Sequence, residues 1–144
     1  MSTTLPPTAT KSLDIFARTI YGEARGESWT GKLAVAWTMR NRADNPGWWG
    51  KDIYSVCLKP WQYSCWLSTD PNAAVITQVT LDTSQFRECF AAACLVYDHR
   101  ISDPTSGATH YYALSMPKPP VWAGKLQPKG TIGNHRFYYE APSG

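Results

Sequence analysis

Glu23 is the side chain of this sequence that is best suited to acid chemistry. It lies near the end of a segment in which apolar residues recur every three to four positions, two residues after Tyr21 and flanked by glycines. A carboxyl group held among aliphatic and aromatic groups loses hydration, which disfavours its charged form and raises its pKa. Such a group can donate a proton near neutral pH. The spacing also allows an exposed glutamate that pairs with Arg25 or Lys32.

Glu27 is a second carboxylate, four residues further on. Two carboxyl groups that act together on a glycosidic bond must flank it, one near the leaving oxygen and the other near the anomeric carbon. Side chains on successive turns of one helix end cannot easily occupy both places. We therefore expect Glu27 to cap a helix or to form a buried pair, and to be a weak candidate for a second catalytic group.

His110 and His135, together with Asp103 or Glu23, are the other possible source of chemistry. Imidazole and carboxylate groups are common zinc ligands. However, neither histidine belongs to an HExxH or HxH pattern, and the four cysteines show no CxxC spacing. The pattern favours histidines that hydrogen-bond within a groove, so we expect no metal and no cofactor.

The aromatic content is unusually high, with seven Trp and eight Tyr in 144 residues. Each presents a broad apolar face and one polar group, which suits stacking on sugar rings or bases. Residues 44–72 form a long aromatic segment without helical or strand periodicity, and segments of this kind are usually functional when they are ordered. We expect this segment to form one wall of a binding groove, although each aromatic ring taken singly could equally fill the core.

The elements that must position these groups are mostly helical. Apolar residues recur with the 3.6-residue period of a helix in residues 13–24, 31–42 and 84–100. The turn at 45–47 (Asn-Pro-Gly) ends the second of these segments. Residues 1–11 are polar and contain prolines, which is typical of a flexible tail. We predict that residues 12–144 form a single domain.

Two short aromatic segments, residues 108–113 and 136–139, have the pattern of β-strands. Because neighbouring side chains of a strand point to opposite faces, one of Tyr111 and Tyr112 is expected to face the groove and the other the core. The predicted fold class is therefore α+β, mostly helical with a small late β element.

Charge and hydropathy exclude several classes of partner. The net charge of +3 is spread along the chain without a basic run, so we expect no nucleic acid partner. No stretch approaches the roughly 20 apolar residues of a membrane span, so we expect no membrane insertion. Residues 1–10 lack the basic start and apolar centre of a secretory signal. Because no export signal is seen, the four cysteines are expected to be reduced thiols, mostly packed inside the protein.

Five blocks carry a resemblance that covers nearly all of residues 13–139. They are residues 20–27 (IYGEARGE), 31–37 (GKLAVAW) with 41–42 (NR), 62–66 (QYSCW), 103–112 (DPTSGATHYY) and 132–138 (IGNHRFY). In their order and approximate spacing, they resemble the catalytic domain of the spore cortex-lytic and related cell-wall hydrolases, the SleB type. Any one block alone would be a weak signal, and the five together are specific.

The resemblance implies a lysozyme-like α+β domain that cleaves the β-1,4 bond between N-acetylmuramic acid and N-acetylglucosamine in peptidoglycan. The residue that matches the catalytic acid of that family is Glu23. Several members are lytic transglycosylases, in which the C6 hydroxyl of the muramic residue attacks its own anomeric carbon, and others hydrolyse the bond. Nine further residues in these blocks and in the aromatic segment are expected to contact the substrate: Tyr21, Gln62, Tyr63, Trp66, Thr109, His110, Tyr111, Tyr112 and His135.

The sequence also departs from that family. The spore enzymes carry a secretion signal and a wall-binding repeat ahead of this domain, and the aromatic segment here is longer than theirs. These differences resemble a bacteriophage endolysin, a monomer held in the host cytoplasm until a holin releases it. Two other functions stay open at this point: a metal-dependent amidase or peptidase that uses His110 and His135, and a non-catalytic glycan-binding module.

Overall fold

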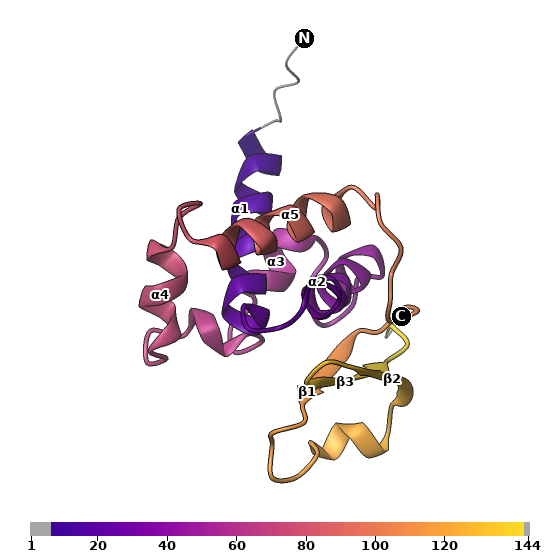
Figure 1. Ribbon diagram of the computed structural model, residues 1–144. Coiled ribbons are helices and arrows are strands. Elements are labelled where there is room, and N and C mark those ends of the chain that lie inside the picture. The colour runs from indigo at the N-terminus through magenta and orange to yellow at the C-terminus, as the bar shows by residue number, and fades with distance from the viewer. Residues whose placement is uncertain (1–6, 143–144) are drawn as a thin grey trace.

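The computed structural model describes residues 7–142, and it places a group of helices beside a small sheet formed by the last third of the chain (Figure 1). In chain order the elements are α1 (Pro7–Ala24), α2 (Trp29–Asp44), α3 (Ile53–Leu58), the 3-10 helix η1 (Ser64–Trp66), α4 (Asn72–Gln78), α5 (Ser84–Tyr97), β1 (His110–Ala113), the 3-10 helix η2 (Val121–Gly124), β2 (Gln127–Ile132) and β3 (His135–Tyr139). The predicted α+β class is confirmed.

Helix α1 lies at the centre of the helical group, where it contacts α2, α3, α4 and α5 (Figure 1). Its predicted apolar positions are all buried: Leu13, Phe16, Ala17, Ile20, Tyr21 and Ala24. The helix begins earlier than predicted, so residues 7–11 are helical where a flexible tail was expected, and residues 1–6 lie outside the described residues. Proline is favoured as a first helical residue because the N–H that it lacks has no intrahelical partner there.

Helix α2 is buried on nearly every side rather than along one stripe, as expected for a helix that packs inside a domain. Its start is set by Ser28, whose side chain accepts a hydrogen bond from the backbone N–H of Gly31 (3.2 Å). Lys32 is buried because its ammonium group donates to the backbone carbonyl of Glu27 (2.6 Å) and pairs with Glu88 of α5 (3.3 Å). The observed helix, Trp29–Asp44, extends two residues beyond the predicted 31–42 at each end.

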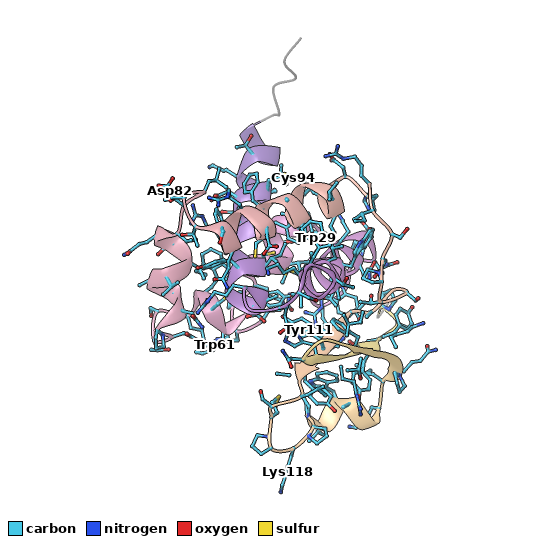
Figure 2. All side chains as sticks on the ribbon, in the orientation of Figure 1. Trp29, Trp61, Asp82, Cys94, Tyr111 and Lys118 are labelled. Atoms are coloured by element: carbon cyan, nitrogen blue, oxygen red, sulfur yellow. The ribbon has the colours of Figure 1, made fainter. Side chains whose placement is uncertain are left out.

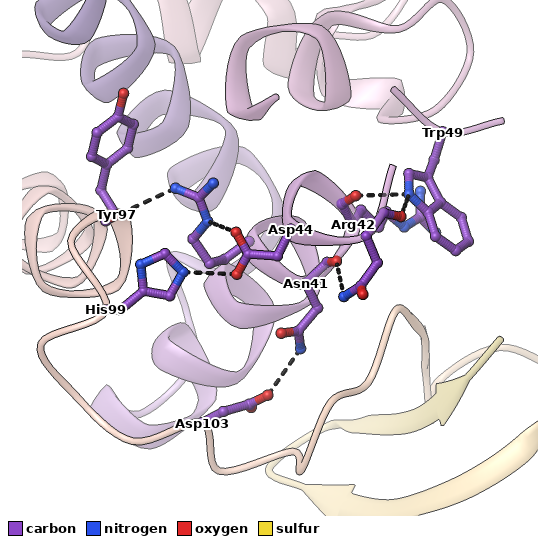
Figure 3. Close-up of polar contacts among 9 residues, drawn as sticks. Asn41, Arg42, Asp44, Trp49, Tyr97, His99 and Asp103 are labelled. Atoms are coloured by element: carbon purple, nitrogen blue, oxygen red, sulfur yellow. Dashed lines mark hydrogen bonds and ion pairs between the residues drawn. The ribbon is translucent and has the colours of Figure 1, made fainter. Parts of the chain in front are cut away.

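The aromatic segment at residues 44–72 is more regular than predicted, because it contains α3 and η1. Asp52 and Ser55 form a reciprocal capping box at the start of α3, a sequence signal that the surrounding aromatic residues obscured. Trp49 belongs to the core: it is fully buried, and its indole N–H donates to the carbonyls of Arg42 (2.8 Å) and Asn45 (3.0 Å) (Figure 3). Only part of the segment is thus available as a groove wall.

Helix α5 ends at Tyr97 instead of the predicted residue 100. His99 adopts a left-handed backbone conformation (φ 56°), which cannot continue an α-helix. Its imidazole Nε2 lies 2.7 Å from the carboxylate of Asp44 at the end of α2, and that carboxylate also accepts from Arg40 (3.1 Å) (Figure 3). The end of α5 is therefore joined to the end of α2.

The sheet is antiparallel with the order β1-β3-β2, and both predicted strands are present as β1 and β3. Strand β2 was not predicted, because it lacks alternation and carries Pro128 and Gly130, where the register shifts. Proline is tolerated in an edge strand, since the N–H that it lacks would not pair with another strand. Strand β2 occupies that edge position.

The four cysteines are unpaired, and Cys57, Cys65 and Cys89 are buried while Cys94 is partly exposed. The expectation of free, mostly packed thiols is confirmed. Within residues 7–142, no helix combines the length and the apolar character that crossing a bilayer requires.

Glu27 joins the helices to the sheet. Its carboxylate accepts hydrogen bonds from the backbone N–H (3.0 Å) and the side-chain amide (2.9 Å) of Asn134 in the turn between β2 and β3. Gly133 in the same turn has a positive φ of 58°, and a Cβ there would lie 2.6 Å from a Glu27 carboxylate oxygen. Glu27 is thus a pairing residue, as expected, but it is only partly buried, and only glycine fits opposite it.

We expect Gly133→Ala to lower the free energy of unfolding by about 1–3 kcal/mol, because the new Cβ is strained in the left-handed region and meets the Glu27 carboxylate. Gly124→Ala is the matched control, since nothing lies within 4 Å of a Cβ built there. Chemical denaturation of both variants measures the difference. Equal stability of the two would show that the turn does not depend on this contact.

Candidate active site

A cleft of about 440 Å³ lies where the end of α1 meets the sheet. Its walls come from α1, α2, the aromatic segment, β1, η2 and the residue that follows β3. Tyr111 lies between the helical group and the sheet, and Trp61 lies at the edge of the helical group (Figure 2). The lining residues are Glu23, Arg42, Trp48, Trp61, Gln62, Tyr63, His110, Tyr111, Trp122, Leu126 and Glu140.

Glu23, at the end of α1, has the electrostatics of a proton donor. Burial raises the pKa of its carboxyl group; hydrogen bonds from Tyr111 and the Cys65 thiol oppose this rise, and the charge of Asp70 adds to it. The net result is a pKa above the ordinary value of 4.5. The carboxyl group therefore keeps its proton to higher pH than an exposed glutamate would.

Tyr111 of β1 holds this carboxyl group from the opposite side of the cleft. Its hydroxyl donates to Glu23 Oε1 across 2.5 Å. Burial and the neighbouring Glu23 charge raise the pKa of Tyr111 well above its ordinary value, so the hydroxyl stays a donor. The pair fixes the Glu23 side chain between a helix end and a strand.

Gly22 lets η1 approach α1 directly beside Glu23. A Cβ at this glycine would lie 2.8 Å from both Cβ and Sγ of Cys65, so any larger residue would push η1 away. The close approach brings the Cys65 thiol into hydrogen-bonding range of the Glu23 carboxyl group.

His110 and Glu140 form a polar cluster elsewhere in the same cleft. The backbone N–H of Glu140 donates to Thr109 Oγ1 (2.9 Å), and that hydroxyl lies 3.0 Å from Nδ1 of His110. The other imidazole nitrogen, Nε2, lies 3.5 Å from Glu140 Oε2, which also accepts from the indole N–H of Trp48 (3.2 Å). Burial, with a smaller effect from the charge of Arg42, lowers the pKa of His110 to about 4, so its ring is neutral at neutral pH.

Arg42 of α2 supports this cluster from behind. Its Nε donates to the carbonyl of Thr109 (2.7 Å), and its guanidinium lies 5.5 Å from the ring centroids of both Trp48 and Trp49. A cation stacked on indole rings is favourable, and it fixes the rings in place.

Five of the ten predicted site residues line the cleft together: Glu23, Gln62, Tyr63, His110 and Tyr111. The Gln62 amide donates to the carbonyls of Trp49 (3.0 Å) and Val56 (2.8 Å), which fixes its orientation. Its Oε1 is buried and has no hydrogen-bond partner within residues 7–142. A buried acceptor without a partner costs free energy, so it is a natural position for a ligand donor.

The structure places Tyr21 and Trp66 away from the cleft lining. Tyr21 packs edge-on against Phe86 of α5 with ring centroids 5.7 Å apart. The Trp66 indole donates to the hydroxyl of Thr19 (3.0 Å) and packs against the core. Both residues belong to the packing of the helical group.

The other three predicted residues also lie behind the lining. Thr109 is buried beneath His110, and Tyr112 stacks on Tyr138 with ring centroids 5.9 Å apart. His135 lies edge-on to Tyr111 (5.0 Å) and 3.5 Å from the Glu27 carboxylate. Tyr111 therefore lines the cleft and Tyr112 does not, although His110, on the same face of β1 as Tyr112, lines the cleft as well.

The two histidines do not meet. In the β1–β3 ladder, His110 pairs with Tyr138 and His135 pairs with Ala113, three positions away. At about 3.4 Å per residue this is a separation of roughly 10 Å along the strands. Within the described residues, no group of three or more His, Cys, Asp or Glu side chains is placed to hold a metal ion.

Six lining residues were not among the predicted site residues: Arg42, Trp48, Trp61, Trp122, Leu126 and Glu140. The aromatic segment already pointed to Trp48 and Trp61. Trp61 is 80 % exposed and has a positive φ of 68°, an uncommon conformation for a bulky residue, which projects the ring at the rim. Trp122, Leu126 and Glu140 carry no sequence pattern, because they reach the cleft only through the way the chain folds around the sheet.

Comparison with known proteins yields a family and two similar structures. The model of the family described as Cell Wall Hydrolase matches residues 26–138, a span that begins three positions after Glu23. The catalytic domain of the germination-specific lytic transglycosylase SleB from Bacillus anthracis is 22 % identical, with a TM-score of 0.67 over 93 % of this chain and 99 % of that one. The catalytic domain of the Bacillus cereus SleB protein is also 22 % identical, with a TM-score of 0.65 over 96 % and 98 %. No curated protein sequence matches the chain.

Glu23 and Glu27 are expected to affect stability with opposite signs. The pKa of Glu23 is raised in the folded protein, so its favourable contribution is complete below about pH 4.5 and is lost as the pH rises through the folded pKa. Burial alone would raise the pKa of Glu27, but hydrogen bonds from Asn134 and the nearby His135 lower it overall. Its contribution is therefore present above about pH 4.5 and is lost as the pH falls through the folded pKa.

At pH 7 we expect Glu23→Gln to melt at or above the temperature of the unmodified protein, because the amide mimics the protonated acid. Glu27→Gln should lose roughly 1–3 kcal/mol, since it replaces charge-assisted hydrogen bonds. Both differences should shrink at acid pH. Thermal melts at several pH values measure them, and a Glu23→Gln variant that is clearly less stable at pH 7 would contradict the raised pKa.

Proposed function

Since this chain belongs to the cell wall hydrolase family, it is an enzyme that degrades cell-wall peptidoglycan, and we propose that it cuts the glycan strand with Glu23 as its general acid. The observation that carries this proposal is the Glu23 carboxyl group. It lies in an aromatic-lined cleft, its pKa is raised by burial, and Tyr111 orients it.

In the proposed reaction, Glu23 protonates the O4 oxygen of N-acetylglucosamine while the bond from that oxygen to C1 of N-acetylmuramic acid breaks. A positioned acid of this kind contributes roughly 10²–10⁴-fold to the rate. Tyr111 donates to Oε1, which leaves Oε2 to carry the transferred proton. The proximity of the Tyr111 hydroxyl also stabilises the carboxylate that remains after transfer.

We further propose that the C6 hydroxyl of the muramic residue completes the reaction. This hydroxyl attacks C1 and returns a proton to the Glu23 carboxylate, so that a 1,6-anhydro sugar forms and the enzyme is restored. The attack is intramolecular, which gives it a large effective concentration. Glu27 is engaged with Asn134 of the β2–β3 turn, and Glu140, the other carboxylate of the cleft, accepts from the Trp48 indole, so the proposed mechanism requires only Glu23 beside the scissile bond.

Gln62 and Tyr63 are proposed to bind an acetamido group of the substrate. Both residues line the cleft, and the buried Tyr63 hydroxyl stays protonated because burial raises its pKa. The predicted residues outside the lining act through packing, Tyr21 and Trp66 within the helical group and Tyr112 within the sheet.

The decisive variant is Glu23→Gln, which we expect to bind wall material but to lyse it at least ~10²-fold more slowly. Asp82→Asn is the matched control, because Asp82 is exposed near the start of α5 and outside the cleft (Figure 2). Turbidity loss of purified peptidoglycan measures the rate. Lysis by Glu23→Gln at the rate of the control would refute the assignment.

Mass spectrometry of the released fragments tests the reaction type. Anhydro-muramic ends are expected. Reducing muramic ends would keep Glu23 as the acid but replace the C6 hydroxyl with water. Free peptides beside intact glycan, together with loss of activity in EDTA, would indicate a metal-dependent amidase instead.

A further inference from the structure

We propose that Glu140, Trp48 and His110 form a second sugar-binding position in the cleft, and that it takes an N-acetylglucosamine ring of the glycan strand. The proposal rests on the glycan-cleaving function above, and it concerns where the strand is held rather than how the bond is cut. All three side chains line the same cleft as Glu23.

The polar groups nearest the two His110 nitrogens are the Thr109 hydroxyl, at hydrogen-bond distance, and the Glu140 carboxylate, at an ion-pair distance of 3.5 Å, and they indicate which nitrogen carries the proton. Nε2 faces Glu140 Oε2, a carboxylate oxygen that can only accept, so this nitrogen carries the proton of the neutral ring. Nδ1 is then the acceptor, and the Thr109 hydroxyl donates to it while receiving the Glu140 backbone N–H. His110 is thereby oriented with its N–H toward Glu140.

The carboxylate of Glu140 keeps an unused acceptor. Its recorded contacts, from the Trp48 indole and the His110 imidazole, are both to Oε2 and both from neutral rings. Within residues 7–142, Oε1 has no recorded hydrogen bond, and the side chain is 33 % exposed. The carboxylate thus presents an acceptor to the cleft, while Arg42, the cation of the same lining, is engaged with the Thr109 carbonyl and stacked on Trp48.

Trp48 supplies an apolar surface next to this acceptor. The Arg42 guanidinium lies over its ring (5.5 Å), and the ring is tilted against Trp49 (centroids 5.4 Å apart). These contacts hold the ring, while 49 % of the residue remains exposed. A fixed indole beside a hydrogen-bond acceptor suits a pyranose ring, which has an apolar C–H face and a rim of hydroxyl donors.

The charge of Glu140 selects between the two sugars of the strand. N-acetylmuramic acid carries a lactyl group, which is either a carboxylate or the attachment point of a peptide with its own carboxylates. A like charge near Glu140 is unfavourable. N-acetylglucosamine is uncharged and offers hydroxyl and amide donors, so it is the ring that fits this position.

Binding of tetra-N-acetylchitotetraose, an uncharged oligomer of N-acetylglucosamine, tests the proposal directly. The measurement uses isothermal titration with the Glu23→Gln protein, in which turnover is blocked. Adding Glu140→Ala or Trp48→Ala is expected to weaken binding about tenfold or more, and Trp48→Phe less, because the phenyl ring keeps the stacking but lacks the N–H.

Two controls match the two residue types. Asp82→Asn removes an exposed carboxylate, and Trp29→Ala removes a partly exposed tryptophan at the start of α2, both outside the cleft (Figure 2). Binding that is equally strong in the Glu140 variant and in the controls would overturn the proposal. This outcome is distinct from failure of the Glu23 assignment, which lysis by the Glu23→Gln protein alone reveals.

Kinetics with soluble glycan strands give a second readout. If Glu140 binds the glycan strand of the substrate, Glu140→Gln raises KM by a larger factor than it lowers kcat. A collapse of kcat at unchanged KM would make Glu140 a second catalytic carboxylate and would also overturn the proposal.

Discussion

The hydrogen bond between Tyr111 and Glu23 is the contact that the rest of the structure must maintain, because it joins β1, a strand that lines the cleft, to the end of the central helix. A carboxyl group taken out of water is unfavourable for folding unless its neighbours hold it. The close packing of η1 over Gly22 and the burial of Tyr111 provide those neighbours. The raised pKa of Glu23 is thus a property of the interface between helices and sheet rather than of α1 alone.

Other contacts keep the two parts in register. Asn41 on α2 donates to Asp103 (2.9 Å; Figure 3). It also donates to the carbonyl of Ala108 (2.9 Å), just ahead of β1. Arg42 donates to the next carbonyl, that of Thr109, and Glu27 holds the far end of the sheet through Asn134. Most of these groups are buried or nearly so, where hydrogen bonds between fixed partners are hard to replace with water.

Local patterns in the sequence were sufficient to predict the elements that bury one face, such as α1 and α5, and the alternation of Tyr111 and Tyr112. They were also sufficient to single out Glu23, because its surroundings on the helix are read directly from neighbouring residues. Glu140 could not be found in this way, since its place in the cleft depends on contacts with Trp48, 92 positions away. Strand β2 and helix α4 were missed because neither has a strongly apolar face, and tertiary contacts rather than periodicity hold them. Tyr21 was assigned to the substrate because it is close to Glu23 in sequence, but a helix turns it toward Phe86 instead.

The packing of the cysteines has a consequence for the chemical durability of the enzyme. Burial raises the pKa of Cys57 and of Cys89 to about 12. Only the thiolate reacts with oxidants, electrophiles and disulfides, and at neutral pH such a group is ionised in roughly one molecule in 10⁵. The fold therefore protects Cys57 and Cys89 by excluding solvent from their thiols, whereas Cys94 is partly exposed.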